Sequence, residues 1–332
     1  FHMKKPFTPA LAASSLVAAA VLTACGGGGD STPAPVPDKL VSISFAAVNG
    51  TTPVKCGTQL TGMGTTGLAA DVKDLRFYIT NLALVNDKGV AVPVKLDANK
   101  WQLTQGSETV SLIDLEDATG TCATAANTAE TNAVITGTVP AGTYVGLKAS
   151  VGVPEVMNHS AAVGGVAPLD NTAILWSWQS GRKFTKIELN PVGGITQAVA
   201  ATATTPATTK NIPTYNLHLG STGCTPKLDA AGVAIANSGT CTNPNIMDFS
   251  VAAFDASTQK VALDMGQLMQ NMGQYKERTG RFVETKHMKV LDKPLRSTGE
   301  VRYVAPQLFE KKTVEPTAEL LRVDGDALRV ER

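Results

Sequence analysis

The feature that most constrains the fold is a succession of short β-prone segments separated by turn residues. These segments are rich in Val, Ile, Thr, Phe and Tyr, and Asn-Asp, Pro-Ala-Gly and Gly-Gly turns lie between them. Five examples are Leu40 to Ala47, Leu75 to Val85, Thr143 to Gly152, Lys183 to Leu189 and Asn245 to Phe254. A helical spacing of apolar residues is confined to Val261 to Met272. The pattern predicts an all-β fold, an antiparallel β-sandwich or barrel-like domain.

Charge divides the chain in two. Residues 273–332 hold 23 of the 57 charged residues, which leaves 34 for the first 272 positions. We therefore place a boundary near Met272. The predicted β domain covers residues 39–272 and is long enough for one core. Residues 273–332 form a small, incomplete β-rich C-terminal segment.

The first residues have the form of a lipoprotein signal peptide. Lys4 and Lys5 precede an apolar run from Ala10 to Thr23, and a Leu-Thr-Ala-Cys box ends at Cys25. The run has 14 residues, and a membrane-spanning helix needs roughly 20. We expect residues 1–24 to be cleaved and Cys25 to be lipidated. The alternative is an ordinary signal peptide that happens to contain Cys25.

Further sequence features agree with an exported, lipid-anchored protein. Residues 25–38 are rich in Gly and Pro and are predicted to be a tether. Removal of residues 1–24 takes away two lysines and no acids, so the formal charge changes from +1 to −1. Such a balance gives no indication of nucleic-acid binding. The predicted location is the periplasm, with the protein attached through its lipid, most simply to the outer membrane.

Four cysteines remain for the exported domain. An even number in an oxidising compartment predicts two disulfides, with three possible pairings. We favour Cys224 with Cys241, because the loop between them is polar and rich in turn residues, and Cys56 then pairs with Cys122 by elimination. A cysteine zinc site is the rival interpretation, and the lack of any C-x₂-C spacing counts against it.

Catalytic motifs are missing from the sequence. It contains no G-x-S-x-G, Walker loop, H-E-x-x-H or C-x-x-C-H. Asp114, Glu116 and Asp117 lie close together in LIDLEDATG, where we interpret them as a solvated strand end or turn rather than as an acid–base pair. The sequence therefore predicts a protein that is not an enzyme.

Histidine and tryptophan are scarce in the predicted β domain. Its two histidines are His159 and His218, and Trp176 and Trp178 lie between them. In a strand, residues two apart point to one face, so both indoles would lie on the same side. Imidazole nitrogens suit copper, nickel or zinc. The spacing alone equally allows structural histidines and a tryptophan pair in the core.

Six segments of the chain have a recognisable sequence: DLRFYITNLALV, LIDLEDATGTC, VPAGTYVGLKASVGVPEVMNH, APLDNTAILWSWQSGRKF, HLGSTGC and CTNPN. Together they resemble the MbnP-like family, the periplasmic copper-binding partners of MauG-like di-haem proteins, also described as four-Cys members of a "metallo-mystery pair". The similarity covers roughly residues 40–272. Arg182 departs from the family pattern, which has Tyr after the Gly of its W-x-W-Q-x-G segment.

The resemblance implies that the protein is a substrate. A MauG-like di-haem partner would oxidise a Trp to kynurenine, which would join histidines around copper. His159 and His218 are the implied ligands, and Trp178 or Trp176 is the implied oxidised residue. Trp101 is a weaker candidate, because the WQL sequence is typical of a strand anchor.

Residues 281–332 of the C-terminal segment read RFVETKHMKVLDKPLRSTGEVRYVAPQLFEKKTVEPTAELLRVDGDALRVER. This sequence resembles the beginning of a LolA-like lipoprotein carrier. A fragment of this length with several amphipathic strands cannot close a core by itself. We therefore assign no lipid carriage to it. Two alternatives to copper binding remain from the sequence: a protein related to lipoprotein carriers, and a purely structural surface lipoprotein.

Overall fold

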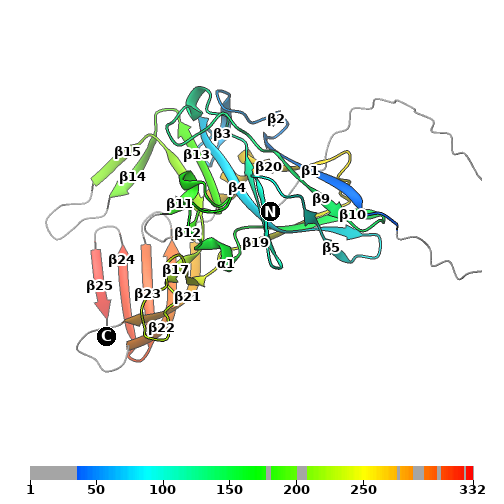
Figure 1. Ribbon diagram of the computed structural model, residues 1–332. Coiled ribbons are helices and arrows are strands. Elements are labelled where there is room, and N and C mark those ends of the chain that lie inside the picture. Colours follow the sequence, from blue (N-terminus) through cyan, green and yellow to red (C-terminus); the bar gives the residue numbers. More distant parts are fainter. Residues whose placement is uncertain are drawn as a thin grey trace, which may run out of the picture. The chain divides into compact units, whose positions relative to one another are not determined.

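The computed structural model describes residues 36–176, 181–199, 208–274, 277–286, 295–304, 308–324 and 327–331 (Figure 1). The chain divides into two compact units. Unit 1 contains the chain up to Ala47 together with Asp74–Ile187 and Leu217–Leu263. Unit 2 contains Val48–Lys73, Glu188–Asn216 and the chain from Asp264 onward. No helix among the described residues is both long and apolar enough to cross a membrane.

One large sheet has five strands in the order β2-β1-β9-β6, with β20 also paired to β1. In β1, alternate residues from Val41 to Ala47 are buried, as expected for a strand with one face toward a core. Its pairing with β9 is antiparallel. The strands are β1 (Lys39–Asn49), β2 (Thr52–Pro53), β6 (Lys95–Leu96), β9 (Val134–Val139) and β20 (Lys260–Asp264).

The other large sheet has nine strands, and β4 (Leu68–Asn86) is its central strand. The main path is β16-β13-β4-β10-β19, while β3, β5 and β8 also pair with β4 and β7 pairs with β8. The other strands are β3 (Gln59–Met63), β5 (Ala91–Pro93), β7 (Gln102–Gln105), β8 (Glu108–Asp114), β10 (Tyr144–Val151), β13 (Thr185–Pro191), β16 (Tyr215–Leu219) and β19 (Met247–Ala252).

The two large sheets share one hydrophobic core within unit 1. Phe45 of β1 and Phe77 of β4 meet edge to face, with ring centroids 6.2 Å apart. Ile43, Ile135 and Leu147 are also fully buried in this core, and each such side chain contributes roughly 1.5–3 kcal/mol through its burial. The predicted antiparallel all-β sandwich is confirmed.

The second face of β4 is buried as well. Leu75, Phe77 and Ile79 alternate with Arg76, Tyr78 and Thr80, and all six are buried. The Tyr78 hydroxyl donates to the carbonyl of Pro168 at 3.0 Å. Pro168 belongs to the segment that follows His159. This second face therefore supports the loops that carry the candidate site.

Three two-stranded ribbons and four short helices complete the domain among the described residues. The ribbons are β11 (Leu175–Trp176) with β12 (Gly181–Arg182), β14 (Ile195–Val199) with β15 (Thr208–Ile212), and β17 (Thr222–Thr225) with β18 (Thr240–Asn243). The helices are η1 (Gly120–Cys122), α1 (Glu155–Asn158), η2 (Thr172–Ile174) and α2 (Met265–Gln274).

The charged C-terminal segment is a separate antiparallel meander of five strands, drawn in orange to red in Figure 1. The small β-rich segment predicted there is confirmed, and residues 287–294 between its first two strands lie outside the described residues. The strands are β21 (Glu277–Lys286), β22 (Leu295–Val304), β23 (Leu308–Glu315), β24 (Glu319–Asp324) and β25 (Ala327–Glu331).

Candidate functional site

His159 is the predicted ligand whose surroundings are most fully defined. It follows the single turn of α1 and is only 5% exposed. Its Nε2 lies 3.1 Å from Sγ of Cys241 and 3.5 Å from the side-chain amide nitrogen of Asn158. The imidazole is therefore held in the protein interior with a ring nitrogen directed at sulfur.

Two glycines leave room for this ring. A Cβ on Gly239 would lie 2.8 Å from both Cγ and Cδ2 of His159, and a Cβ on Gly181 would lie 3.4 Å from its Cε1. The first distance is shorter than any normal carbon contact. Gly239 must therefore be a glycine for His159 to occupy this position.

The sulfur beside His159 belongs to a disulfide. Cys224 and Cys241 are bonded to each other and are Cα partners on β17 and β18, so the predicted pairing is confirmed. Cys56 and Cys122 are also disulfide-bonded. Of the His, Cys, Asp and Glu side chains that the structure describes, His159, Cys224 and Cys241 form the group whose three ligand atoms all lie within 4.8 Å of one another.

A cavity of about 490 Å³ opens beside this group. Its walls include His159, Leu175, Cys224 and residues 234–239 of the loop that the disulfide closes. The volume falls within the range usual for small-ligand pockets. A small ion in the cavity would therefore have access to the imidazole and to a sulfur atom.

Trp176 lies near the glycines that surround the candidate site. Its Cα partner across the β11–β12 ribbon is Gly181, the glycine whose Cβ, if it had one, would touch the His159 ring. The half-buried indole packs on Gly220, where a Cβ would come within 2.5 Å of its Cζ3. Gly220 follows His218 by two residues, so the segments around His159, Trp176 and His218 meet in one region of unit 1.

Arg182 binds the backbone of the segment that carries His159. Its guanidinium is 1% exposed and donates to the carbonyl oxygens of Met157, Asn158, Ala161 and Leu169 at 2.6–3.3 Å. Its backbone nitrogen donates to the side-chain oxygen of Asn158 at 2.8 Å. Burial lowers the pKa of Arg182. Its Nε has no hydrogen-bond partner.

Comparison with known proteins identifies the family of this chain. The MbnP family model matches residues 38–284. The chain belongs to the MbnP family. A solved structure of MbnP from Methylosinus trichosporium is similar, with a TM-score of 0.57 and 33% sequence identity over 70% of this chain and 78% of that one. A search of the curated proteins finds no match.

Within this MbnP domain the predicted site residues have different outcomes. The structure brings His159, the Cys224–Cys241 disulfide and Trp176 together. His218 lies half-buried on β16 and is not a member of the His159 group, so a coordination sphere shared by the two histidines stays a prediction. Trp178 and Cys25 lie outside the described residues. Trp101 packs against the core, as expected for a strand anchor.

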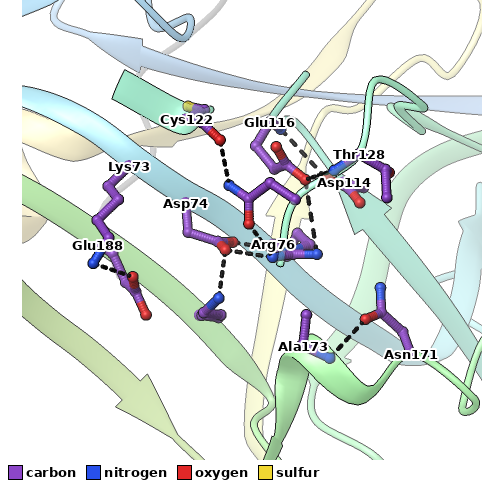
Figure 2. A network of polar contacts seen from close by, with 12 residues as sticks. Lys73, Asp74, Arg76, Asp114, Glu116, Cys122, Thr128, Asn171, Ala173 and Glu188 are labelled. Atoms are coloured by element: carbon purple, nitrogen blue, oxygen red, sulfur yellow. Dashed lines mark hydrogen bonds and ion pairs between the residues drawn. The ribbon is translucent and has the colours of Figure 1, made fainter. Parts of the chain in front are cut away.

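A second group of polar residues in the MbnP domain was misinterpreted from the sequence. Asp114 and Glu116 are not a solvated strand end, because they are 1% and 0% exposed. Figure 2 shows them around Arg76, which also pairs with Asp74. Lys186 binds the same Asp74 carboxylate at 2.6 Å. The partners come from β4 and β13, far from LIDLEDATG in the chain, so local sequence gave no signal of this burial.

The buried cluster shifts the pKa values of its members. Burial raises the pKa of Asp114 to about 7, although Arg76 opposes the shift. Burial also raises the pKa of Glu116, while backbone hydrogen bonds from Ala118 and Thr128 lower it. For Arg76, burial by itself lowers the pKa, but the hydrogen bond and charge of Asp74, together with the charges of Asp114 and Glu116, outweigh it and the net shift is upward.

Proposed function

We propose that this protein is an exported copper-binding protein whose site is completed by oxidation of a tryptophan. His159 and His218 supply imidazole nitrogens, and Trp178 or Trp176 is converted to kynurenine by a MauG-like di-haem partner. Oxidation opens the indole to an aniline nitrogen and a carbonyl, which adds donors that Trp lacks. The protein is thus a substrate of its partner and not itself an enzyme.

One observation carries the proposal: His159 lines a cavity in an MbnP domain, and the ribbon that bears Trp176 lies against its ring. The donor set is suitable, because imidazole is a common ligand for copper in proteins. Arg182 fixes the backbone on both sides of His159 through the carbonyls of Asn158 and Ala161. A ligand held in this way loses little conformational freedom when it binds a metal.

The predicted lipid anchor gives the proposal its setting. An N-terminal lipid at Cys25 would hold the domain at the periplasmic side of the outer membrane by a Gly- and Pro-rich tether. In that compartment both an exported di-haem partner and copper are accessible to the domain.

The experiment compares the full chain expressed with and without a di-haem partner. Co-expression should give a small mass increase confined to the peptide that contains Trp176 and Trp178, because a ring carbon is lost and oxygen is gained. Copper binding should tighten at the same time. Trp176→Phe and Trp178→Phe variants identify the oxidised residue, and Trp101→Phe is the matched control that should retain both effects.

The two histidines are tested in the same preparation. His159→Ala and His218→Ala should each abolish the gain in copper affinity while the mass increase remains. A protein that gains no copper affinity after oxidation, or whose gain survives loss of both histidines, would contradict the proposed site.

A further inference from the structure

The sulfur atoms next to His159 have no part in the proposed copper site, which uses nitrogen ligands. They nevertheless lie where metal ligands would lie. The Nε2 of His159 and the Sγ atoms of Cys224 and Cys241 are all within 4.8 Å of one another, and both His159 and Cys224 line the cavity. As a disulfide, the two sulfurs are poor ligands, because it is the thiolate that binds metals.

We propose that reduction of the Cys224–Cys241 disulfide creates a second, redox-controlled metal site formed by Cys224, Cys241 and His159. Two thiolates and one imidazole form a soft donor set that favours Cu(I). This site is independent of His218, of tryptophan oxidation and of the di-haem partner, and shares only His159 with the proposed function.

The chemistry requires a dithiol reductant of the periplasm. One of its thiolates attacks a sulfur of the disulfide to form a mixed disulfide, and its second thiol then releases the reduced protein. The reductant becomes a disulfide, and Cys224 and Cys241 become two thiols. When Cu(I) enters from the cavity, the two thiols lose their protons to solvent and bind the metal as thiolates.

The local structure keeps the three ligands in place after reduction. Cys224 and Cys241 face each other on the hydrogen-bonded β17–β18 ribbon. The base of the ribbon is fixed by Asn245, whose side chain donates to Gly220 at 2.8 Å, and by Ser221, whose hydroxyl donates to Pro244 at 2.9 Å. The ligands therefore do not depend on the S–S bond alone for their positions.

Accessibility favours reduction at this disulfide over the other. Cys224 and Cys241 are both half-buried and Cys224 lines the cavity, whereas the other disulfide joins a half-buried Cys56 to a fully buried Cys122 and offers one accessible sulfur. Because thiol exchange requires access of the attacking thiolate to sulfur, mild reduction should open Cys224–Cys241 first. Mass mapping of alkylated thiols gives a direct check of that order.

The test uses the full chain without a di-haem partner, first oxidised and then mildly reduced without oxygen. Cu(I) is offered in competition with a chelator, and Co(II) is used separately as a spectroscopic probe of thiolate binding. The reduced protein should take up one Cu(I) per chain and show thiolate-to-Co(II) charge-transfer absorption. The oxidised protein should do neither.

Matched variants separate this site from the proposed function. Cys224→Ser combined with Cys241→Ser should remove the uptake that follows reduction. His159→Ala should weaken it by at least about tenfold, since even loss of a group that only orients a ligand costs about 10–100-fold. His218→Ala should leave it unchanged, whereas the proposed copper site needs His218.

Two results would overturn the inference. One is Cu(I) uptake by the reduced protein no greater than that of the double serine variant. The other is a His159→Ala protein that binds as tightly as the unaltered chain after reduction. Neither result bears on whether oxidised tryptophan and His218 form the proposed copper site.

Discussion

Burial of charge is the main chemical feature of this chain at the scale of single residues. Asp74, Arg76 and Lys186 form a buried set of ion pairs, and Asp114 lies among them with a pKa of about 7. Isolating a carboxylate from water favours its neutral form. Near neutral pH, Asp114 is therefore the member of the cluster whose charge changes most readily.

Asp114→Asn should make stability less dependent on pH. Between the ordinary aspartate pKa and about 7, Asp114 holds a proton in the folded state and lacks it in the unfolded state. Its contribution to stability is thus full below that window and is lost as the pH rises through it. As the pH rises from 5 to 8, the free energy of unfolding of the variant should increase by about 2 kcal/mol relative to that of the unaltered chain. Denaturant unfolding at the two pH values measures this change.

Asp117→Asn is the matched control for this measurement. Asp117 is a neighbour in the same loop, but its carboxylate caps an exposed turn by accepting from the backbone and hydroxyl of Thr119. Its substitution leaves the buried cluster intact, so the dependence of stability on pH that comes from Asp114 should remain. A stability difference for Asp114→Asn that is equal at pH 5 and pH 8 would show that Asp114 does not titrate there.

At the scale of elements, Arg182 connects the β11–β12 ribbon to the segment that carries His159. Its guanidinium satisfies four carbonyl groups between Met157 and Leu169. Met157 and Asn158 end α1, and Ala161 and Leu169 lie in irregular backbone, so none of these carbonyls has a strand neighbour to pair with. A buried carbonyl without a partner costs roughly 1–3 kcal/mol, so this single side chain determines much of the stability of the segment.

Arg182→Met should therefore destabilise the domain by on the order of 3 kcal/mol. The carbonyls of Asn158, Ala161 and Leu169 lose the guanidinium as donor while apolar packing is kept, and the Met157 carbonyl still accepts from Ser160. Hydrogen exchange should rise most in residues 157–169 and much less in β1 or β9. Lys100→Met is the control, since Lys100 is exposed and pairs with an exposed Glu130. Unchanged exchange in residues 157–169 would contradict the role of Arg182.

The sequence predicted most strands but not the exceptions within them. The segment Leu75 to Val85 is part of one strand, as expected, yet Asn81 has a positive φ of 54° and the register with β10 shifts beside it. Such a bulge depends on the partner strand and leaves no periodic signal. Val261 to Met272 is helical only from Met265, because Val261 pairs as part of β20 and Asp264 caps the helix by accepting from Gln267.

The candidate site could be predicted only in part for a similar reason. Its chemical residues stood out by their scarcity, and the Cys224–Cys241 pairing followed from the loop between them. The contact of His159 with that disulfide, and the glycines that permit it, depend on chain segments about 80 residues apart. Proximity of that kind is decided by the packing of whole loops and is not encoded in local spacing.

At the scale of the whole molecule, the proposed lipid anchor would determine where the folded domain acts. The sequence places Cys25 directly after an apolar segment, which we expect to be cleaved, and separates it from β1 by Gly- and Pro-rich residues. A single thiol with attached lipid would hold the domain at a membrane surface without any contact from its sheets. Attachment should therefore depend on Cys25 and not on the integrity of the β domain.

Cys25→Ser should release the exported protein from the membrane fraction, because serine cannot carry a thioether-linked lipid. The measurement is fractionation of cells followed by a high-salt wash, which removes proteins held only by charge. Ser31→Ala, a change within the same tether, should leave the protein in the membrane fraction. A Cys25→Ser protein that stays there after the wash would show that some other part of the chain binds the membrane, and the lipid anchor would have to be abandoned.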